Sequence, residues 1–560
     1  MKKYHLLLLS VLSGLLFTLG WPADGFPGLL FIAFVPLFFI DNYIDKHRDR
    51  FNRYSIWFYV YPAFLIWNGL CTWWVWNATP GGGVAAVVVN AFFMALVFNI
   101  YHISKRNIYP SRNALFILVL YWISFEYFHL NWDMNWPWLN LGNGFANYVK
   151  WIQWYEFTGT FGGTLWILVV NILIYRTIKI LFHFEESAKS IGQGVKHLTL
   201  GPSRLALRSL LFALSSLLIL IVPMILSFVM YSNYEEEPRP VNIIITQPNV
   251  DPYTEQYSLP PSVVINRNLS EAEPYLDEHT DFIVSPESAI QERIWERAVE
   301  QYRSLNLLRQ FIHEHPHTSI IIGASTRKEF LPGDEISPTA RKFIDVDKYY
   351  DAFNTAFYLD TGNIRQWSHK SRLTPGVESM PFPKYLKFLE SLAIDMGGTV
   401  GSLGVDPEPI VFVRASDSLK TAAPICFESI FGEFFAGFVR NGAELIFVIT
   451  NDGWWGNTPG HKQHFSFSRI RAIENRRSIA RSANTGISAF INQRGDVMQE
   501  LGYWIPGALS QALNANTKLT FYTKYGDYIA RISSFITAIL LLYTIARILI
   551  KRKKPLVSTK

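Results

Sequence analysis

Three residues with reactive side chains, Glu287, Lys370 and Cys426, each follow a short apolar run in the second half of this 560-residue sequence. Cys426 ends the strand-like run Thr421–Ile425 and begins the next helix. A thiol at such a turn faces backbone N–H groups and the positive end of the helix, which lowers its pKa and makes it a nucleophile. The alternative, and the usual role of a lone cysteine, is a buried residue of the hydrophobic core. The other cysteine, Cys71, lies inside an apolar segment.

Glu287 and Lys370 favour the interpretation of Cys426 as a nucleophile over that of a buried core residue. Glu287 follows the β-branched run Asp281–Val284, and Lys370 ends a predicted hairpin that returns through the turn at 361–363. Each alone is typical of a solvated surface charge. A carboxylate, a cation and a thiol that all lie where strands end can together supply a base, an anion-binding group and a nucleophile.

Long apolar runs predict a membrane protein. Hydrophobic residues make up 49% of the chain and are concentrated in segments of about 20 residues, the length of a membrane-spanning helix. We expect an N-terminal membrane domain with about seven helices (1–231), an outer domain (232–525), and a C-terminal helix with a basic tail (526–560). The expected spans are 4–20, 27–44, 54–76, 84–103, 113–130, 157–178, 207–231 and 528–550.

Lys and Arg gather in alternate loops between these spans. Because cationic loops stay on the cytoplasmic side, we expect both termini in the cytoplasm and residues 232–525 on the outer face. The intervening loops 21–27 and 77–83 contain no Lys or Arg, and 131–156 contains only Lys150. These membrane-edge charges account for the net charge of +6 and give no reason to expect a nucleic-acid partner. The cationic loop residues are Lys2, Lys3, Lys46, Arg48, Arg50, Arg53, Lys105, Arg106, Arg112, Arg176, Lys179, Lys189, Lys196, Arg204, Arg208, Arg547, Lys551, Arg552, Lys553 and Lys554.

Cysteine and histidine usage predicts neither a disulfide nor a metal or other cofactor. The two cysteines lie in different environments, and the sequence has no CxxC or HExxH motif. His461 and His464 flank two polar residues in a segment that reads as exposed, and we interpret them as the N-terminal region of a helix. The first span could also be a signal peptide, but Trp21-Pro22 and Asp24 make a poor cleavage site and favour a retained helix.

The order Glu287, Lys370, Cys426, followed by a strand at 445–450 and the loop Asn451–Gly456, resembles the Glu-Lys-Cys constellation of the nitrilase superfamily. This resemblance covers roughly residues 240–515 and implies an αββα sandwich. With the membrane helices, nearly the whole chain is similar to the apolipoprotein N-acyltransferases. The motifs that carry this second resemblance are 137–142, 155–162, 451–456 and 461–464. The expected fold is therefore a polytopic α-helical membrane domain of about eight spans plus an α/β nitrilase-like αββα sandwich.

The resemblance implies an activity and a location. The family moves the sn-1 acyl chain of a phospholipid onto the α-amino group of the S-diacylglyceryl cysteine that begins a lipoprotein, through a cysteine thioester. It implies a multi-pass protein of the bacterial inner membrane, monomeric, with its catalytic domain on the periplasmic side. The partners would be the phospholipid acyl donor and the N-terminus of a diacylglyceryl-prolipoprotein.

It also implies residue roles. Cys426 would be the nucleophile, Glu287 the general base and acid, and Lys370 the cation that stabilises the oxyanion. Glu378 matches the glutamate after the lysine motif and would hold Lys370. Phe427, in place of an aromatic tyrosine, and Glu428 match the two positions after the nucleophile, and the N–H of Phe427 would be a second oxyanion donor. Trp454 and Trp455 would form a substrate lid, and Tyr257, where the family often places a tryptophan, receives no role.

Three other interpretations stay open. A membrane-tethered nitrilase-type amidase or hydrolase would use the same triad, with water or a small amine as acceptor. The tryptophans of loop 131–156 argue against it, because such rings prefer the lipid headgroup level. A scaffold with a degenerate module is disfavoured because all three triad positions are filled. A transporter would show ionisable groups or broken helices at mid-membrane depth, and of the spans only the fifth carries such a group, Glu126.

Overall fold

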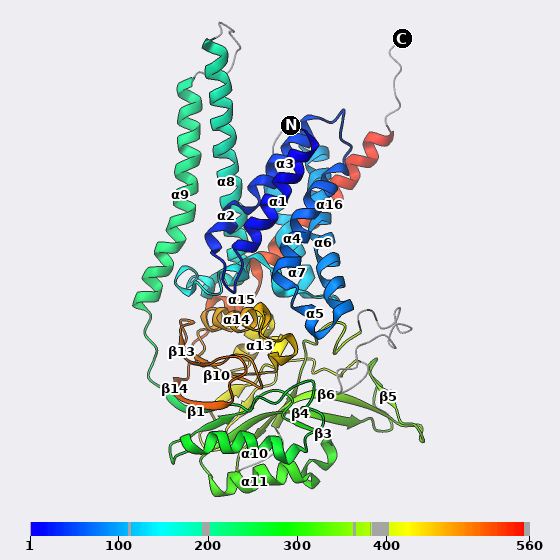
Figure 1. Ribbon diagram of the computed structural model, residues 1–560, viewed down its shortest axis with the longest axis vertical. Helices are drawn as coiled ribbons and strands as arrows, with labels where there is room; N and C mark the ends of the chain where they lie inside the picture. The colour runs from blue at the N-terminus through cyan, green and yellow to red at the C-terminus, as the bar shows by residue number, and fades with distance from the viewer. Residues whose placement is uncertain are drawn as a thin grey trace.

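The computed structural model describes residues 2–109, 114–192, 202–361, 366–380, 382 and 402–553. It has a helical half and a half built from two β-sheets, and the N-terminus and the C-terminal end of the last helix lie away from the sheets (Figure 1). The last helix before the sheets ends at Asn233, and the first strand begins at Pro240. Among the basic loop residues named above, Arg112, Lys196 and Lys554 lie outside the described residues.

Each expected span coincides with helix. The helices are α1 (Lys3–Leu19), α2 (Leu30–Ala33), α3 (Val35–Lys46), α4 (Ser55–Thr72), α5 (Val75–Ala78), α6 (Pro80–Ile108), α7 (Phe116–Leu130), α8 (Tyr155–Gly192), α9 (Pro202–Asn233) and α16 (Tyr528–Lys553). Proline at the start of α6 lacks only an N–H that the helix would leave unpaired, and the Thr79 side chain caps this helix by accepting from Gly82 N at 3.1 Å.

Five segments of the described chain are long and apolar enough to cross a membrane: 27–46, 80–108, 155–182, 209–233 and 528–551. α1 and α7 are shorter apolar helices. The most apolar of the five, in α9, has only 11% of its residues buried inside the protein, so it presents apolar side chains outward on nearly every side. A helix of this kind requires an apolar surrounding, which a lipid bilayer provides. The number of eight spans stays a prediction.

The helical half contains an ionic cluster that the sequence analysis overlooked. Asp41 on α3 accepts hydrogen bonds from Tyr101 and Lys105 of α6, at 3.1 and 2.6 Å, and lies 2.5 Å from the His102 ring. Asp41 and His102 lie near the ends of the expected spans 27–44 and 84–103. Glu126 itself is fully paired with donors from Trp122, Leu141 and Thr164, so these groups act as links between helices.

The second half is an αββα sandwich, as predicted. In the first sheet the order is β14-β1-β2-β4-β6-β5, with β3 paired to β4 and β7 to β6; in the second it is β13-β12-β11-β10-β9-β8. Strands of the first sheet are β1 (Pro240–Gln247), β2 (Phe282–Val284), β3 (Ile290–Trp295), β4 (Ser319–Glu329), β5 (Arg341–Lys342), β6 (Tyr349–Leu359), β7 (Gln366–His369) and β14 (Gly507–Asn514). Strands of the second are β8 (Phe412–Val413), β9 (Lys420–Ala422), β10 (Leu445–Thr450), β11 (Ile479–Ala483), β12 (Ser488–Ile491) and β13 (Val497–Leu501).

Aliphatic side chains hold these layers together. Ile245, Val284 and Phe447 belong to the core between the two sheets. The helices α10 (Pro261–Ala272) and α11 (Arg303–Glu314) cover the outer face of the first sheet. The helices α13 (Gly432–Arg440) and α14 (Pro459–Asn475) cover the second, on the side of the sandwich that faces the helical half (Figure 1).

The two halves share one apolar core. Phe427, Phe431 and Phe467 of the sandwich are buried in the same cluster as Trp74 and Trp138 of the helical half. Polar links join this interface, including Gln463 Nε2 to Cys71 O at 3.1 Å. The sandwich is therefore seated on the helices through the turn that contains Cys426.

Candidate active site

Cys426 lies at a strained turn between a strand and a helix. The chain leaves β9, bridges β10 once more through Ile425 and Ile449, and enters the 3₁₀-helix η8 (Cys426–Ile430) before α13. The predicted strand-to-helix turn is therefore present, with a 3₁₀-helix in place of an α-helix at its start. Cys426 has φ of +49°, in the left-handed region that costs a residue with a side chain about 1–3 kcal/mol and that often marks functional sites.

Glu287 lies in the loop directly after β2 and is 7% exposed. The loop can approach β4 because Gly323 has no side chain: a Cβ there would lie 2.6 Å from Cα of Glu287. Oε1 of Glu287 accepts from Asn354 Nδ2 at 2.7 Å and from Lys370 Nζ at 3.2 Å. Oε2 accepts from the backbone N of Asn451 at 3.0 Å, so donors from three separate segments orient the carboxylate.

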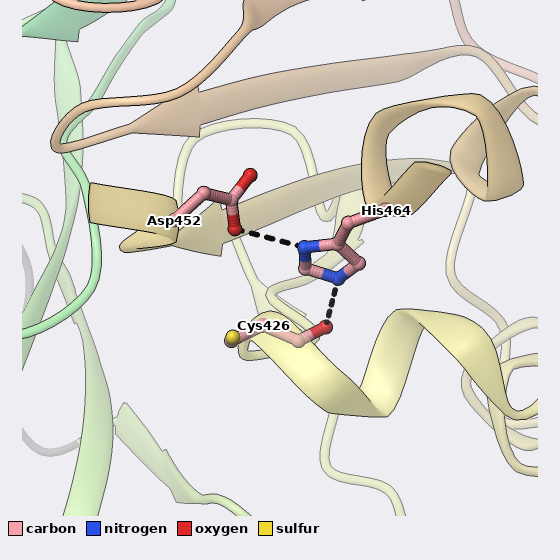
Figure 2. Close-up of side chains that lie close together, drawn as sticks. All are labelled: Cys426, Asp452 and His464. Atoms are coloured by element: carbon pink, nitrogen blue, oxygen red, sulfur yellow. Dashed lines mark hydrogen bonds and ion pairs between the residues drawn. The ribbon is translucent and has the colours of Figure 1, made fainter. Parts of the chain in front are cut away.

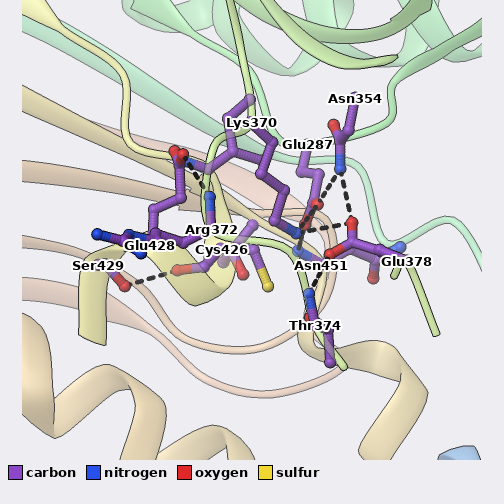
Figure 3. Close-up of polar contacts among 12 residues, drawn as sticks. Glu287, Asn354, Lys370, Arg372, Thr374, Glu378, Cys426, Glu428, Ser429 and Asn451 are labelled. Atoms are coloured by element: carbon purple, nitrogen blue, oxygen red, sulfur yellow. Dashed lines mark hydrogen bonds and ion pairs between the residues drawn. The ribbon is translucent and has the colours of Figure 1, made fainter. Parts of the chain in front are cut away.

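Lys370 follows β7, the second strand of the predicted hairpin, and is 2% exposed. Residues 362 and 363 of the predicted turn lie outside the described part of the chain. The Lys370 ammonium donates to Glu287 and, at 2.8 Å, to Oε1 of Glu378, as Figure 3 shows. Burial alone would lower the pKa of Lys370, but the two carboxylates raise it well above its usual value. Lys370 is thus a permanent cation beside the thiol.

The backbone turn that follows Lys370 orients Glu378. Its Oε2 accepts from Thr374 N at 2.9 Å, and its Oε1 accepts from Asn354 Nδ2 at 3.2 Å as well as from Lys370. Burial would raise the pKa of Glu378, but Lys370 and these donors lower it below its ordinary value. Glu287, Lys370 and Glu378 therefore form one hydrogen-bonded group.

The electrostatic surroundings of Cys426 contradict the lowered thiol pKa expected from the sequence. Burial and the negative charge of Glu287 raise the pKa of the Cys426 thiol, while Lys370 opposes them and lowers it. Cys426 is 9% exposed, and burial in a low-dielectric site disfavours the charged thiolate. The resting group is therefore a neutral thiol, which must lose its proton to a base as it attacks.

Glu428 joins the nucleophile turn to the lysine loop. Its carboxylate accepts from Ile425 N at 2.7 Å, and also from Ser371 N at 2.5 Å and Arg372 N at 3.3 Å (Figure 3). Burial raises the pKa of Glu428 to about 7, although these donors lower it. The Glu428 side chain fixes the distance between Lys370 and Cys426, because it accepts hydrogen bonds from backbone N–H groups beside each of them.

The two tryptophans of loop 451–456 have different positions. Trp454 lies with Glu287, Glu378 and Asn451 around a cavity of about 100 Å³, and its ring packs on Tyr253 with centroids 5.2 Å apart. Tyr257 also lines this cavity. Trp455 instead packs against Trp74 and Trp138 of the helical half. The predicted pair therefore consists of one residue at the cavity and one at the junction of the two halves.

Sequence reasoning missed Asn354. It lies on β6, where the sequence shows only one amide within an apolar run, and its Nδ2 bridges Glu287 and Glu378 while its backbone O accepts from Lys370 N at 2.8 Å. His464 was also misjudged. It lies in the first half of α14, as expected for a helix start, but it is fully buried and not exposed.

Cys426, Asp452 and His464 bring potential metal ligands within 4.8 Å of one another (Figure 2). The surroundings do not suit a cation. Arg481 Nη2 lies 2.7 Å from Asp452 Oδ2 and 3.0 Å from His464 Nδ1. The positive guanidinium is therefore already paired with two of the three candidate ligand residues. A metal ion would have to displace that charge, and we interpret the group as a hydrogen-bonded network.

Comparisons with known proteins identify relatives of both halves of the chain. Residues 13–173 match the family described as apolipoprotein N-acyltransferase N-terminal domain, and residues 264–518 match the carbon-nitrogen hydrolase family. The apolipoprotein N-acyltransferase of Chlorobaculum tepidum is 27% identical over 96% of each chain. Those of Geobacter metallireducens and Rickettsia prowazekii are each 26% identical, over 93% and 98% of this chain and 92% and 99% of their own.

Among solved structures, an amidase from Nesterenkonia sp. aligns with 51% of this chain and 95% of its own at 16% identity and a TM-score of 0.33, too low a similarity to add to the assignment. The sequence matches cover both halves of the molecule and include the sheets that carry Glu287, Lys370 and Cys426. The chain is thus a membrane protein that belongs to the apolipoprotein N-acyltransferases, acyltransferase enzymes with a carbon-nitrogen hydrolase domain.

Proposed function

We propose that this enzyme transfers the sn-1 acyl chain of a phospholipid to the α-amino group of the diacylglyceryl cysteine that begins an apolipoprotein, through a thioester on Cys426. The enzyme would act as a monomer at the periplasmic face of the bacterial inner membrane. The catalytic domain would span 232–525, between a membrane domain at 1–231 and a C-terminal helix at 526–560. The observation that carries the proposal is the buried group of Glu287 and Lys370 beside the Cys426 thiol, on a turn packed against the membrane half.

The first half-reaction loads the enzyme. Glu287 takes the proton of the thiol as the sulfur attacks the ester carbonyl carbon, and a C–S bond forms. The carbonyl oxygen becomes an oxyanion, which Lys370 and the N–H of Phe427 stabilise; one such donor is typically worth ~3 kcal/mol. Collapse of this intermediate breaks the bond to the glycerol oxygen, which receives the proton from Glu287 and leaves as lysophospholipid.

The second half-reaction unloads it. The α-amine of the acceptor attacks the thioester carbonyl, and Glu287 removes a proton from the attacking nitrogen. The same donors hold the second oxyanion. Its collapse forms the amide and releases the thiolate, which regains its proton from Glu287.

The neighbours of this group have supporting roles in the proposal. Glu378 keeps Lys370 charged and in place, Glu428 keeps the lysine loop against the nucleophile turn, and Trp454 closes the cavity beside Glu287. Phe427 and Phe431, next to the nucleophile, are buried in one cluster with side chains of the helical half. This contact between the site and the apolar helices supports a lipid donor. Acyl chains leave a bilayer at a cost of about 0.8 kcal/mol per CH₂, so such a site must lie at the lipid surface.

The test is a transfer assay with the purified full chain, a phospholipid with a labelled sn-1 chain, and a diacylglyceryl-cysteine peptide. Cys426→Ala should abolish labelling of the peptide, whereas Cys71→Ala, which removes the thiol inside α4, should leave it nearly unchanged. Transfer by Cys426→Ala at the wild-type rate would refute the thiol mechanism. Release of free fatty acid with no labelled peptide would favour a membrane-tethered hydrolase.

A further inference from the structure

Ser429, His464 and Asp452 form a second buried array directly behind Cys426, and the reaction above does not use it. Ser429 Oγ lies 3.1 Å from His464 Nε2, and His464 Nδ1 lies 2.8 Å from Asp452 Oδ1. All three side chains are fully buried. The order of groups matches that of a serine-hydrolase triad, so the first question is whether Ser429 is a second nucleophile.

The hydrogen bonds of Ser429 exclude that role. Its hydroxyl donates to the backbone O of Cys426 at 2.7 Å, and His464 Nε2 faces the same oxygen at 3.1 Å (Figure 2 shows the His464 contact). A carbonyl oxygen only accepts, so Nε2 of His464 must carry a hydrogen for this contact to be a hydrogen bond. Both side chains are therefore directed at the Cys426 carbonyl and not at a substrate.

That carbonyl belongs to the peptide unit whose N–H is the N–H of Phe427. A trans peptide unit is planar, with its C=O and N–H pointing in opposite directions, so fixing the oxygen also fixes the hydrogen. Two donors on the oxygen further polarise the unit and strengthen the N–H as a donor. The contacts behind Cys426 thus set the direction and strength of the proposed oxyanion donor in front of it.

The array is itself anchored to the second sheet. Asp452 accepts from Thr450 Oγ1 of β10 at 2.8 Å and from Arg481 Nη2 of β11 at 2.7 Å. Burial alone would raise the pKa of Asp452, but His464 and Arg481 hold it well below its usual range. Arg481 Nη2 also lies 3.0 Å from His464 Nδ1, where a ring that carries its hydrogen on Nε2 accepts a hydrogen bond. The position of His464 is therefore set by the Arg481–Asp452 pair and not by the turn that holds Cys426 at a φ of +49°.

We propose that His464, held by the Arg481–Asp452 pair and assisted by Ser429, is a positioning residue that locks the Cys426–Phe427 peptide unit so that the Phe427 N–H faces the oxyanion. This inference rests on the proposed function, since it assumes that Cys426 is acylated. It predicts that His464 contributes to steps that pass through an oxyanion and not to the reactivity of the sulfur itself.

The experiment compares two reactions of Cys426 in the full chain, each measured for wild type, His464→Asn, His464→Gln and Ser429→Ala. The first is single-turnover loading of an acyl chain from phospholipid, which forms an oxyanion. The second is alkylation by iodoacetamide in a Cys71→Ala background, a displacement that forms none. Asn places an amide near the former Nδ1 and removes the donor to the Cys426 oxygen, whereas the amide of Gln reaches the former Nε2 and can restore it.

We expect His464→Asn to load about 10- to 100-fold more slowly than wild type, with alkylation changed less than twofold, and His464→Gln to recover most of the loss. Ser429→Ala should show a smaller loss of the same kind. Loading by His464→Asn at the wild-type rate, or an equal fall in loading and alkylation, would overturn the inference. If wild type itself acquired no acyl chain, the proposed function would fail instead.

Discussion

At the scale of single residues, the active site depends on charges that are buried but paired. His369, the residue before Lys370, shows this outside the reacting group. Its ring contacts Asp406 Oδ1 at 2.8 Å and Glu296 Oε1 at 2.9 Å and stacks on Phe353. Burial alone would lower the pKa of His369, but the two carboxylates raise it to about 9. The imidazolium therefore joins three segments that surround Lys370.

This pairing predicts a pH-dependent stability. The folded pKa of about 9 lies above the ordinary histidine value, so the stabilisation is complete below about pH 6.5 and is lost as the pH rises through 9. A shift of this size corresponds to about 3 kcal/mol. In thermal unfolding of the detergent-solubilised chain, the gap in Tm between wild type and His369→Gln should be large at pH 7 and should shrink towards pH 10. A gap that stays constant over this range would contradict the prediction.

Residue-level prediction from the sequence reached the groups that differ chemically from their surroundings. Glu287, Lys370 and Cys426 are charged or reactive residues at the ends of apolar runs, whereas Glu378 and Glu428 were implied by the family resemblance. The structure brings all five together. Asn354 and Ser429 gave no such signal, and Asp452, although it follows the apolar strand 445–450, was given no role of its own. The side-chain partners of Asn354 lie 24 and 67 positions away, and the burial of Ser429 and Asp452 cannot be read from residue type or spacing.

At the scale of elements, the site is positioned by how closely strands and loops can approach. Strand 445–450, the 366–369 hairpin strand and the turn at Cys426 follow from apolar runs and turn residues, and they are present in the structure. The close approach of the Glu287 loop to β4 does not follow from such patterns. It depends on Gly323, because a Cβ would lie 2.6 Å from both Cα of Glu287 and N of Ser288.

Gly323→Ala should therefore displace Glu287 without removing any reactive group. We expect acyl transfer to fall by at least tenfold, since a shift of about 1 Å at a catalytic group can cost 100-fold. The matched control is Gly502→Ala, whose Cβ would meet only Ile505 Cδ1 at 3.4 Å. Transfer rates at saturating phospholipid measure both variants. Full activity in Gly323→Ala would show that the Glu287 loop does not depend on this contact.

At the scale of the whole molecule, the two halves share one apolar core and form one body. Both the N-terminus and the C-terminal end of α16 lie at the end of the helical half away from the sheets (Figure 1). The tip between β5 and β6 lies on the sandwich and exposes 99% of Ile344. The sidedness that the alternation of cationic loops indicates stays a prediction. The packing of Trp455 between Trp74 and Trp138 could not be predicted, because it joins residues more than 300 positions apart.

Sidedness can be tested with single cysteines in a chain that carries Cys71→Ala and Cys426→Ala. Ile344→Cys should react with a membrane-impermeant maleimide in intact spheroplasts, because this tip should face outward. Arg50→Cys, in the exposed loop between α3 and α4, should react only after the membrane is opened. The opposite pattern would invert the topology and remove access of the catalytic domain to lipoproteins outside the cytoplasm.

The most direct test of the account is the intact mass of the full-length enzyme after incubation with phospholipid alone. If Cys426 stores the acyl group, wild type should gain the mass of one acyl chain, lose it to hydroxylamine, and pass it to a diacylglyceryl-cysteine peptide added later. Glu287→Gln should stay unloaded, because it lacks the base that removes the thiol proton. Steady release of free fatty acid by wild type, with no loaded enzyme at any time, would contradict the account.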